Sequence, residues 1–100
     1  MDILNLEQYR FKKAKIFLSY DRGRDIRKKS GITNIKELTI IIPKDIYCIN
    51  YSFWVGLLED YNPKMIINIK NQGEYPHKKN FNYAIKKLSN GNTNALIQEI

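Results

Sequence analysis

Residues Glu37–Tyr61 read ELTIIIPKDIYCINYSFWVGLLEDY and join the most β-branched run of the chain to an apolar helical pattern. The run Leu38 to Ile42 predicts a buried strand. Pro43 has no N–H to donate, so pairing should stop there, and Ile46 to Ile49 is a candidate for a short second pairing. From Phe53 to Tyr61 the apolar residues predict a helix. A buried strand that leads through a polar turn into an apolar helix is typical of a layered α/β domain.

Three other segments predict strands. Met1 to Tyr9 is either a short strand or a loose turn of helix, and its pattern favours the strand. Lys15 to Tyr20 (KIFLSY) is β-branched and aromatic, and Met65 to Lys70 reads MIINIK. With the central strand they make a small mixed sheet of about four strands, with the helices packed mainly on one face. The 100 residues contain no internal repeat and no linker, so residues 1–100 are expected to form a single α/β domain.

Helical patterns lie between and after these strands. Asp21 is a suitable N-cap for a helix that runs through Lys29. Either Ser30-Gly31 closes this helix, because Gly is the usual residue after a helix end, or the helix continues, because Ile32 and Ile35 extend the apolar positions begun at Ile26.

Two further helices are expected near the C-terminus. From Lys78 onward, Phe81, Ala84, Ile85 and Leu88 fall on one helical face. A last short helix is predicted from Asn94 to Ile100.

Composition limits the classes of protein. Lys and Arg number 17 against 10 Asp and Glu, which gives a net charge of +7. The balance is ten against four in residues 1–36, one against four in 37–62 and six against two in 63–100, so the basic residues lie on both flanks. The single cysteine, Cys48, excludes an internal disulfide and favours a reducing, cytoplasmic location. No apolar run approaches the ~18 residues of a membrane span, and the N-terminus lacks the pattern of a signal peptide.

The residues offer no catalytic constellation. His77 is the only histidine, so a metal site or a Cys–His pair is not expected. The five glycines do not match the spacing of a phosphate-binding loop. We therefore expect no enzyme activity, no metal and no cofactor.

The turn at Asn50 to Phe53 carries the strongest functional signal. Ser52 stands where a helix N-cap belongs, and Phe53-Trp54 follows it directly. One interpretation is structural: Ser52 is an ordinary cap and the aromatic pair is core. The other is a partner-binding surface, which a phosphoryl group at the helix N-terminus could switch. The second interpretation predicts a surface made of Tyr51, Ser52, Phe53 and Trp54, with Arg22 and Arg24 as neighbours.

Basic side chains form the second signal, because interleaved lysines, arginines and aromatics are what a nucleic-acid surface uses. Lysines that simply solvate exposed helix faces are the alternative. The candidate contacts to phosphate or nucleic acid are Arg27, Lys28, Lys29, Lys78, Lys79, Lys86 and Lys87.

The order of these motifs resembles the bacterial STAS-like domains of unknown function, which in turn resemble the anti-sigma-factor antagonist fold. The resemblance covers roughly residues 15–90 and is best at Ser52-Phe53, followed by the apolar helix with Gly56-Leu57-Leu58. Family members usually place an acidic residue where this chain has Ile42-Pro43, and another where it has Val55-Gly56. The resemblance implies a non-enzymatic regulatory module that docks a protein partner.

These observations give two hypotheses on function. The first is a regulatory or protein-interaction module that docks a partner through the junction around Ser52. The alternative is a small basic phage or mobile-element protein that binds nucleic acid or inhibits a host nucleoprotein defence complex. A homodimer is compatible with either, and neither requires a membrane.

Overall fold

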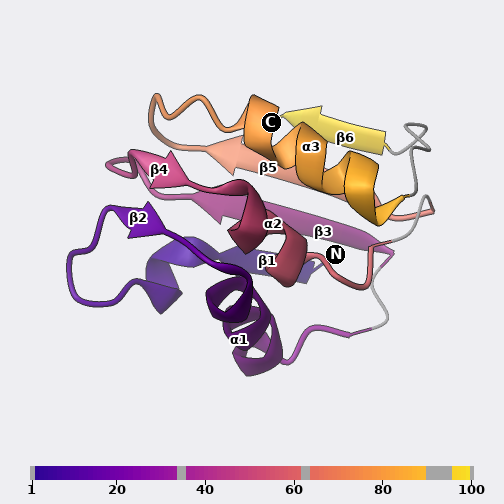
Figure 1. The fold of residues 1–100 in the computed structure, drawn as a ribbon, viewed down its shortest axis with the longest axis horizontal. Helices are drawn as coiled ribbons and strands as arrows, with labels where there is room; N and C mark the ends of the chain where they lie inside the picture. The colour runs from indigo at the N-terminus through magenta and orange to yellow at the C-terminus, as the bar shows by residue number, and fades with distance from the viewer. Residues whose placement is uncertain (1, 34–35, 62–63, 90–95, 100) are drawn as a thin grey trace.

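The computed structural model describes residues 2–33, 36–61 and 64–89, and the backbone of 96–99. Its main sheet contains β1 (Asp2–Asn5), β3 (Glu37–Ile42), β5 (Ile66–Asn71) and β6 (Leu96–Glu99) in the order β1-β3-β5-β6 (Figure 1). All three pairings are parallel. The α/β class agrees with the sequence, and three of the expected strands lie in this sheet, as β1, β3 and β5. The prediction of a mixed sheet is wrong. Long crossovers join the paired strands, and such connections return the chain in the same direction.

Three α-helices lie on the same face of this sheet: α1 (Tyr20–Ser30), α2 (Tyr51–Leu57) and α3 (Lys78–Leu88). Each connection moves one strand further in the same direction along the sheet. Because such crossovers share one hand, they place their helices on one side. The central helix α2 packs against both α1 and α3. Among the described residues, no helix has the length and apolar character needed to span a membrane.

A second, two-stranded sheet lies beside the helix layer, at the carboxyl end of the main strands (Figure 1). It pairs β2 (Ile16–Phe17) in parallel with β4 (Cys48–Ile49). The predicted strand Lys15 to Tyr20 is therefore shorter than expected, and α1 already begins at its last residue. The second pairing expected at Ile46 to Ile49 exists, but with β2 rather than in the main sheet.

The register of the main sheet separates its two faces. Leu38, Ile40 and Ile42 of β3 are fully buried beneath the helices. Thr39 and Ile41 alternate with them and so point to the opposite face. The same alternation in β5 sends Ile67 and Ile69 to the core, which is completed by the following buried residues from the other elements: Leu4, Leu6, Phe17, Ile26, Ile46, Ile49, Phe53, Trp54, Val55, Leu57, Leu58, Tyr61, Met65, Phe81, Ala84 and Ile85.

Two helix boundaries differ from the sequence prediction. Helix α1 is capped by Ser19 rather than Asp21, because the Ser19 hydroxyl accepts a hydrogen bond from the Arg22 N–H at 3.2 Å. Of the two ends that the sequence left open, the structure has the earlier one: the helix closes at Gly31, whose φ of 69° is left-handed. Helix α2 ends at Leu57, four residues before the predicted Tyr61.

The last predicted helix, Asn94 to Ile100, is wrong where the structure describes it. Residues Leu96–Glu99 form β6 and pair with the free edge of β5. An open strand edge offers backbone partners that a short helix lacks, so tertiary context overrides the local pattern. Residues 94, 95 and 100 lie outside the described part of the chain.

Segment β1 carries the first expected strand, but it continues into a 3-10 turn, η1 (Leu6–Tyr9). Leu6 of this turn is buried, and the turn packs beside β3. The predicted strand Met1 to Tyr9 is thus half strand and half turn.

Candidate docking surface

The junction before α2 is organised by Asn50, not by Ser52. The Asn50 side-chain oxygen accepts hydrogen bonds from the Phe53 N–H at 2.9 Å and from the Ser19 N–H at 3.2 Å. Asn50 is therefore the N-cap of α2, and the prediction that Ser52 fills that position is wrong. The same oxygen ties the end of β2 to the end of β4. Ser52 lies within the first turn of α2 and is half-buried.

Phe53 and Trp54 lie in the core, where neither has any exposed surface. Their rings continue a chain of aromatic contacts: Phe17 to Phe53 at 5.2 Å between centroids, and Trp54 to Phe81 at 5.0 Å. Geometries of this kind add to the burial energy. In this conformation only the half-buried Tyr51 and Ser52 of the four predicted docking residues reach the surface, so the aromatic pair fits the structural interpretation.

Arg22 and Arg24 are both bonded within the chain. Arg22 donates to the Tyr9 carbonyl and lies 3.8 Å from Asp25, and Arg24 forms an ion pair with Glu59 at 3.3 Å. Arg22 lies in the first turn of α1, on the helix that Asn50 links to α2. Arg24 instead faces the C-terminal end of α2.

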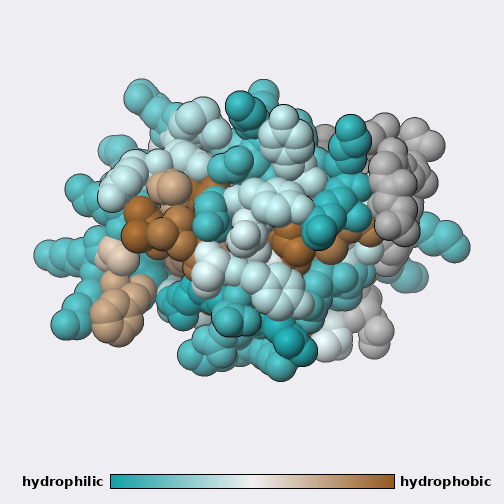
Figure 2. All heavy atoms as spheres, in the orientation of Figure 1, coloured by the Kyte–Doolittle hydropathy of each residue, from teal (hydrophilic) through white to brown (hydrophobic). Residues whose placement is uncertain are grey.

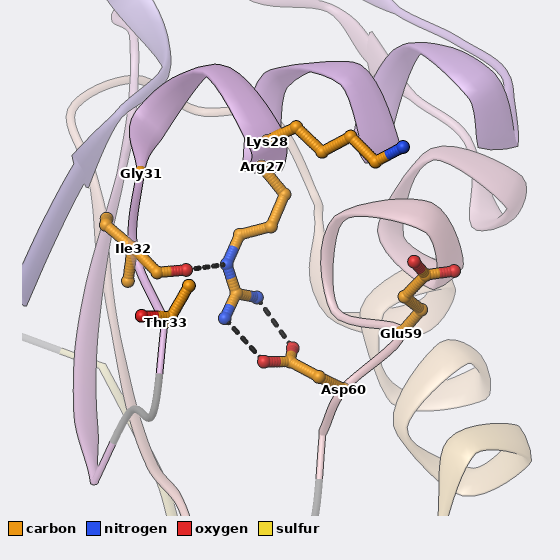
Figure 3. Close-up of a pocket in the computed structure, with 7 residues that line it drawn as sticks. All are labelled: Arg27, Lys28, Gly31, Ile32, Thr33, Glu59 and Asp60. Carbon is orange, nitrogen blue, oxygen red and sulfur yellow. Dashed lines mark hydrogen bonds and ion pairs between the residues drawn. The ribbon is translucent and has the colours of Figure 1, made fainter.

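Arg27, predicted as a phosphate contact, is a buried structural clamp. It donates two hydrogen bonds to Asp60, at 2.8 and 2.7 Å, and one each to the carbonyls of Leu57 and Ile32. Figure 3 shows the guanidinium between the Ile32 carbonyl and Asp60, on one side of an open pocket of about 330 Å³. With its donors directed at protein acceptors, Arg27 gives no support to the phosphate prediction.

The predicted lysine contacts are exposed but divided between two helices. Lys28 and Lys29 belong to α1, and Lys29 pairs with Asp25 at 2.9 Å. The other four belong to α3, and α2 separates the two helices. The structure therefore brings the two clusters to opposite sides of α2 rather than into one patch. The four lysines of α3 are Lys78, Lys79, Lys86 and Lys87.

The titratable groups form no reactive arrangement in the described residues. His77 is buried, and its Nδ1 lies 3.2 Å from the Asn71 side-chain nitrogen. Cys48 is a half-buried free thiol on β4. No group of three His, Cys, Asp or Glu side chains among the described residues has the geometry to hold a metal ion.

A different surface emerges around β2 and β4. We define the β2–β4 surface by the exposed apolar residues Phe11, Ile16, Leu18 and Tyr47, together with the lysines at 12, 13 and 15. Phe11 and Tyr47 are 72% and 67% exposed. Figure 2 shows apolar atoms gathered over these two strands and the loop before them. Four of the seven exposed large apolar residues in the described chain belong to this corner, which makes it a patch rather than scattered surface.

The loop that presents Phe11 is held in place by Arg10. Its guanidinium donates to both oxygens of Asp45, at 2.8 and 3.0 Å, and its Nε donates to the Ala14 carbonyl at 3.0 Å. The hydrogen bond from Arg10 lowers the pKa of the Asp45 carboxyl below its usual value. The β2–β4 surface is thus built on a braced loop.

Strand β2 also has a free backbone edge. The Phe17 carbonyl accepts from the Asn50 N–H, so Phe17 faces β4. In a parallel pair alternate residues face the neighbour, and Ile16 and Leu18 therefore direct their backbone groups to the other edge. No described residue hydrogen-bonds to the backbone of Leu18. Unpaired edges of this kind can accept an additional strand.

The lysines of this surface are available for an external partner. Lys12, Lys13 and Lys15 are exposed, and none of them forms an ion pair within the described residues. Lys12 instead places its ammonium 5.7 Å from the centre of the Phe11 ring. The surface therefore combines apolar side chains with positive charge that no ion pair among the described residues neutralises.

Comparison with known proteins gave no significant match to a protein-family model, to a curated protein or to a solved structure.

Proposed function

We propose that this protein is a non-enzymatic interaction module that docks an extended, acidic and apolar segment of a partner protein on the β2–β4 surface. The observation that carries the proposal is the gathering of Phe11, Ile16, Leu18 and Tyr47 at one corner of the domain. The regulatory role implied by the resemblance to STAS-like domains belongs to the same proposal. The docking surface that we propose extends from the junction at Asn50 toward β2. It does not include the aromatic pair Phe53 and Trp54 of α2.

Three properties of the surface specify the partner. The apolar side chains favour burial against aliphatic or aromatic residues. The free edge of β2 favours an extended segment, since β-augmentation supplies backbone hydrogen bonds. The three unpaired lysines favour acidic residues, which also raise the association rate at low salt.

Site-specific photo-crosslinking tests this proposal. A photoreactive amino acid is placed at Tyr47, and at Tyr83 of α3 as a matched control, because Tyr83 is 56% exposed but lies outside the surface. In cells that encode the protein, we expect a crosslinked partner from position 47 only. The crosslink should disappear with Ile16→Glu and Leu18→Glu, which place charges in the apolar centre, provided both variants melt like the parent. A crosslink that survives both changes would exclude this docking surface.

Single-stranded nucleic acid is the second candidate, because exposed aromatics beside lysines also form stacking platforms. The Lys12 and Phe11 pair is the specific observation that favours it. Binding to a labelled oligonucleotide is measured at low and at physiological salt. Tight binding that weakens when Phe11 and Tyr47 are replaced by Ser would favour nucleic acid over a protein partner. Weak retention that vanishes at physiological salt would be the ordinary result of a net charge of +7.

A further inference from the structure

The face of the main sheet opposite the helices has its own pattern. From β3 it presents Glu37, Thr39 and Ile41, and from β5 it presents Ile66, Asn68 and Lys70. On β1, Ile3 belongs to the same face and is 60% exposed. We call this the open face. All three α-helices lie on the other side (Figure 1).

Two physical arguments indicate that another molecule covers the open face when the protein functions. Parallel sheets occur almost always with both faces covered, whereas antiparallel sheets tolerate one wet face. Further, Ile3 on this face is 60% exposed and Ile41 and Ile66 are only half-buried, so a covering partner would remove apolar surface from water.

The charges of the open face indicate what covers it. Glu37 and Lys70 are its only charged residues among the described strand positions, so the face is neutral although the chain carries +7. A strongly acidic partner would find no counterpart here. Glu37 stands at the amino end of β3 and Lys70 near the carboxyl end of the neighbouring β5. The two charges therefore lie at opposite corners, with Thr39 and Asn68 midway between them.

This arrangement is self-complementary. Consider two copies that stack through their open faces, related by a two-fold axis that lies between the two sheets, runs across the strands and passes over the point between Thr39 and Asn68. Glu37 of each copy then lies opposite Lys70 of the other, which gives two ion pairs. The isoleucines at 3, 41 and 66 then pack between the two sheets, as in a face-to-face sandwich. We propose that the protein forms a homodimer through the open faces of two main sheets. This interface is separate from the β2–β4 surface, so it can fail without affecting the proposed function.

The test is the association state of the whole chain by sedimentation equilibrium, from about 1 µM to about 1 mM, a range that detects dissociation constants between those values. We expect a concentration-dependent dimer. Ile41→Lys and, independently, Ile3→Lys should each weaken it by at least about tenfold, because the partner sheet would cover the lysine and remove it from water. Tyr83→Lys, which adds the same charge on exposed α3, should leave it unchanged. Circular dichroism melts establish that each variant is folded.

A charge swap tests the orientation of the two copies. Lys70→Glu places like charges against Glu37 at both ends and should also weaken the dimer at least about tenfold. Adding Glu37→Lys to this variant restores opposite charges and should recover the dimer. A chain that stays monomeric throughout the range, or a dimer that neither Ile41→Lys nor Ile3→Lys weakens, overturns the proposal. A double variant that remains as weak as Lys70→Glu overturns the two-fold arrangement.

Discussion

Arg27 of α1 donates two parallel hydrogen bonds, of 2.8 and 2.7 Å, to the carboxylate of Asp60, which lies three residues beyond the end of α2. The same guanidinium donates to the Leu57 carbonyl at 3.0 Å, so one side chain satisfies the carboxyl end of α2 and fixes it to α1. This contact explains how α2 can end with acidic residues, which by themselves oppose the helix dipole.

Arg27→Met should therefore destabilise the protein by about 1–3 kcal/mol. The loss is less than for a fully buried pair, because the Asp60 side chain is half exposed. Arg27→Lys should recover little, since an ammonium cannot replace the two-pronged contact. Urea unfolding measures both. Lys29→Met, which breaks an exposed pair with Asp25, is the control and should cost less than about 1 kcal/mol.

Gly56→Ala should be among the most damaging small changes. A Cβ at Gly56 would lie 2.0 Å from the Tyr20 carbonyl oxygen, and one at Gly23 would lie 2.2 Å from the Phe53 carbonyl oxygen. The glycines thus let α1 and α2 approach backbone to backbone. We expect a loss of about 3 kcal/mol or more, measured by thermal melt. Gly31→Ala meets no atom within 4 Å and should cost only the left-handed strain of about 1 kcal/mol. Equal losses at the two positions would refute the close-packing explanation.

Asn50 and Ser52 should behave differently when changed to Ala. Asn50→Ala removes the cap of α2 and the bond to Ser19, which predicts a loss of about 1–2 kcal/mol. Ser52→Ala should stay within about 0.5 kcal/mol, because its hydroxyl is not the cap. Denaturant midpoints of the two variants distinguish the assignments, and the reverse order would return the cap to Ser52.

The Arg10–Asp45 contact predicts a dependence of stability on acid. The pKa of Asp45 is lowered in the folded state by its hydrogen bond to Arg10. A carboxyl with a lowered pKa stabilises the fold above its unfolded pKa, and that stabilisation is lost as the pH falls through the folded pKa. Asp45→Asn should therefore lower the melting temperature near neutral pH, and the difference from the parent should shrink below about pH 4. A difference that is constant with pH would contradict this role.

The sequence correctly predicts the elements in which the spacing of apolar residues directly reflects which positions are buried. Leu38 to Ile42 is buried at every position except the half-buried Ile41, and α3 has its apolar residues on one face, as its 3.6-residue period indicates. The parallel direction of the sheet and the β6 strand could not be read in this way. Both depend on how segments that are far apart in the sequence pair with one another. A local sequence pattern contains no information on such pairing.

The burial of Phe53 and Trp54, predicted as docking residues, is already indicated by the apolar pattern around them. Phe53 to Leu58 is apolar at every position, and a helix that is hydrophobic all round is buried on all sides. That pattern places Phe53 and Trp54 in the core. At β2, by contrast, Ile16 and the residue after the strand, Leu18, flank the buried Phe17, so this alternation of apolar residues could have indicated the exposed patch.

The main sheet adds its strands in the order in which they leave the ribosome. In β1-β3-β5-β6, each new strand pairs with the edge left by the one before it, and no later strand is inserted between earlier ones. Assembly can therefore proceed from the N-terminus during synthesis, with each helix closing over the pair just formed. Every intermediate exposes a single growing strand edge, β3 and then β5. Slow synthesis of the segment after β5 would leave that edge open longest, and this is the stage at which misassociation between nascent chains is most to be expected.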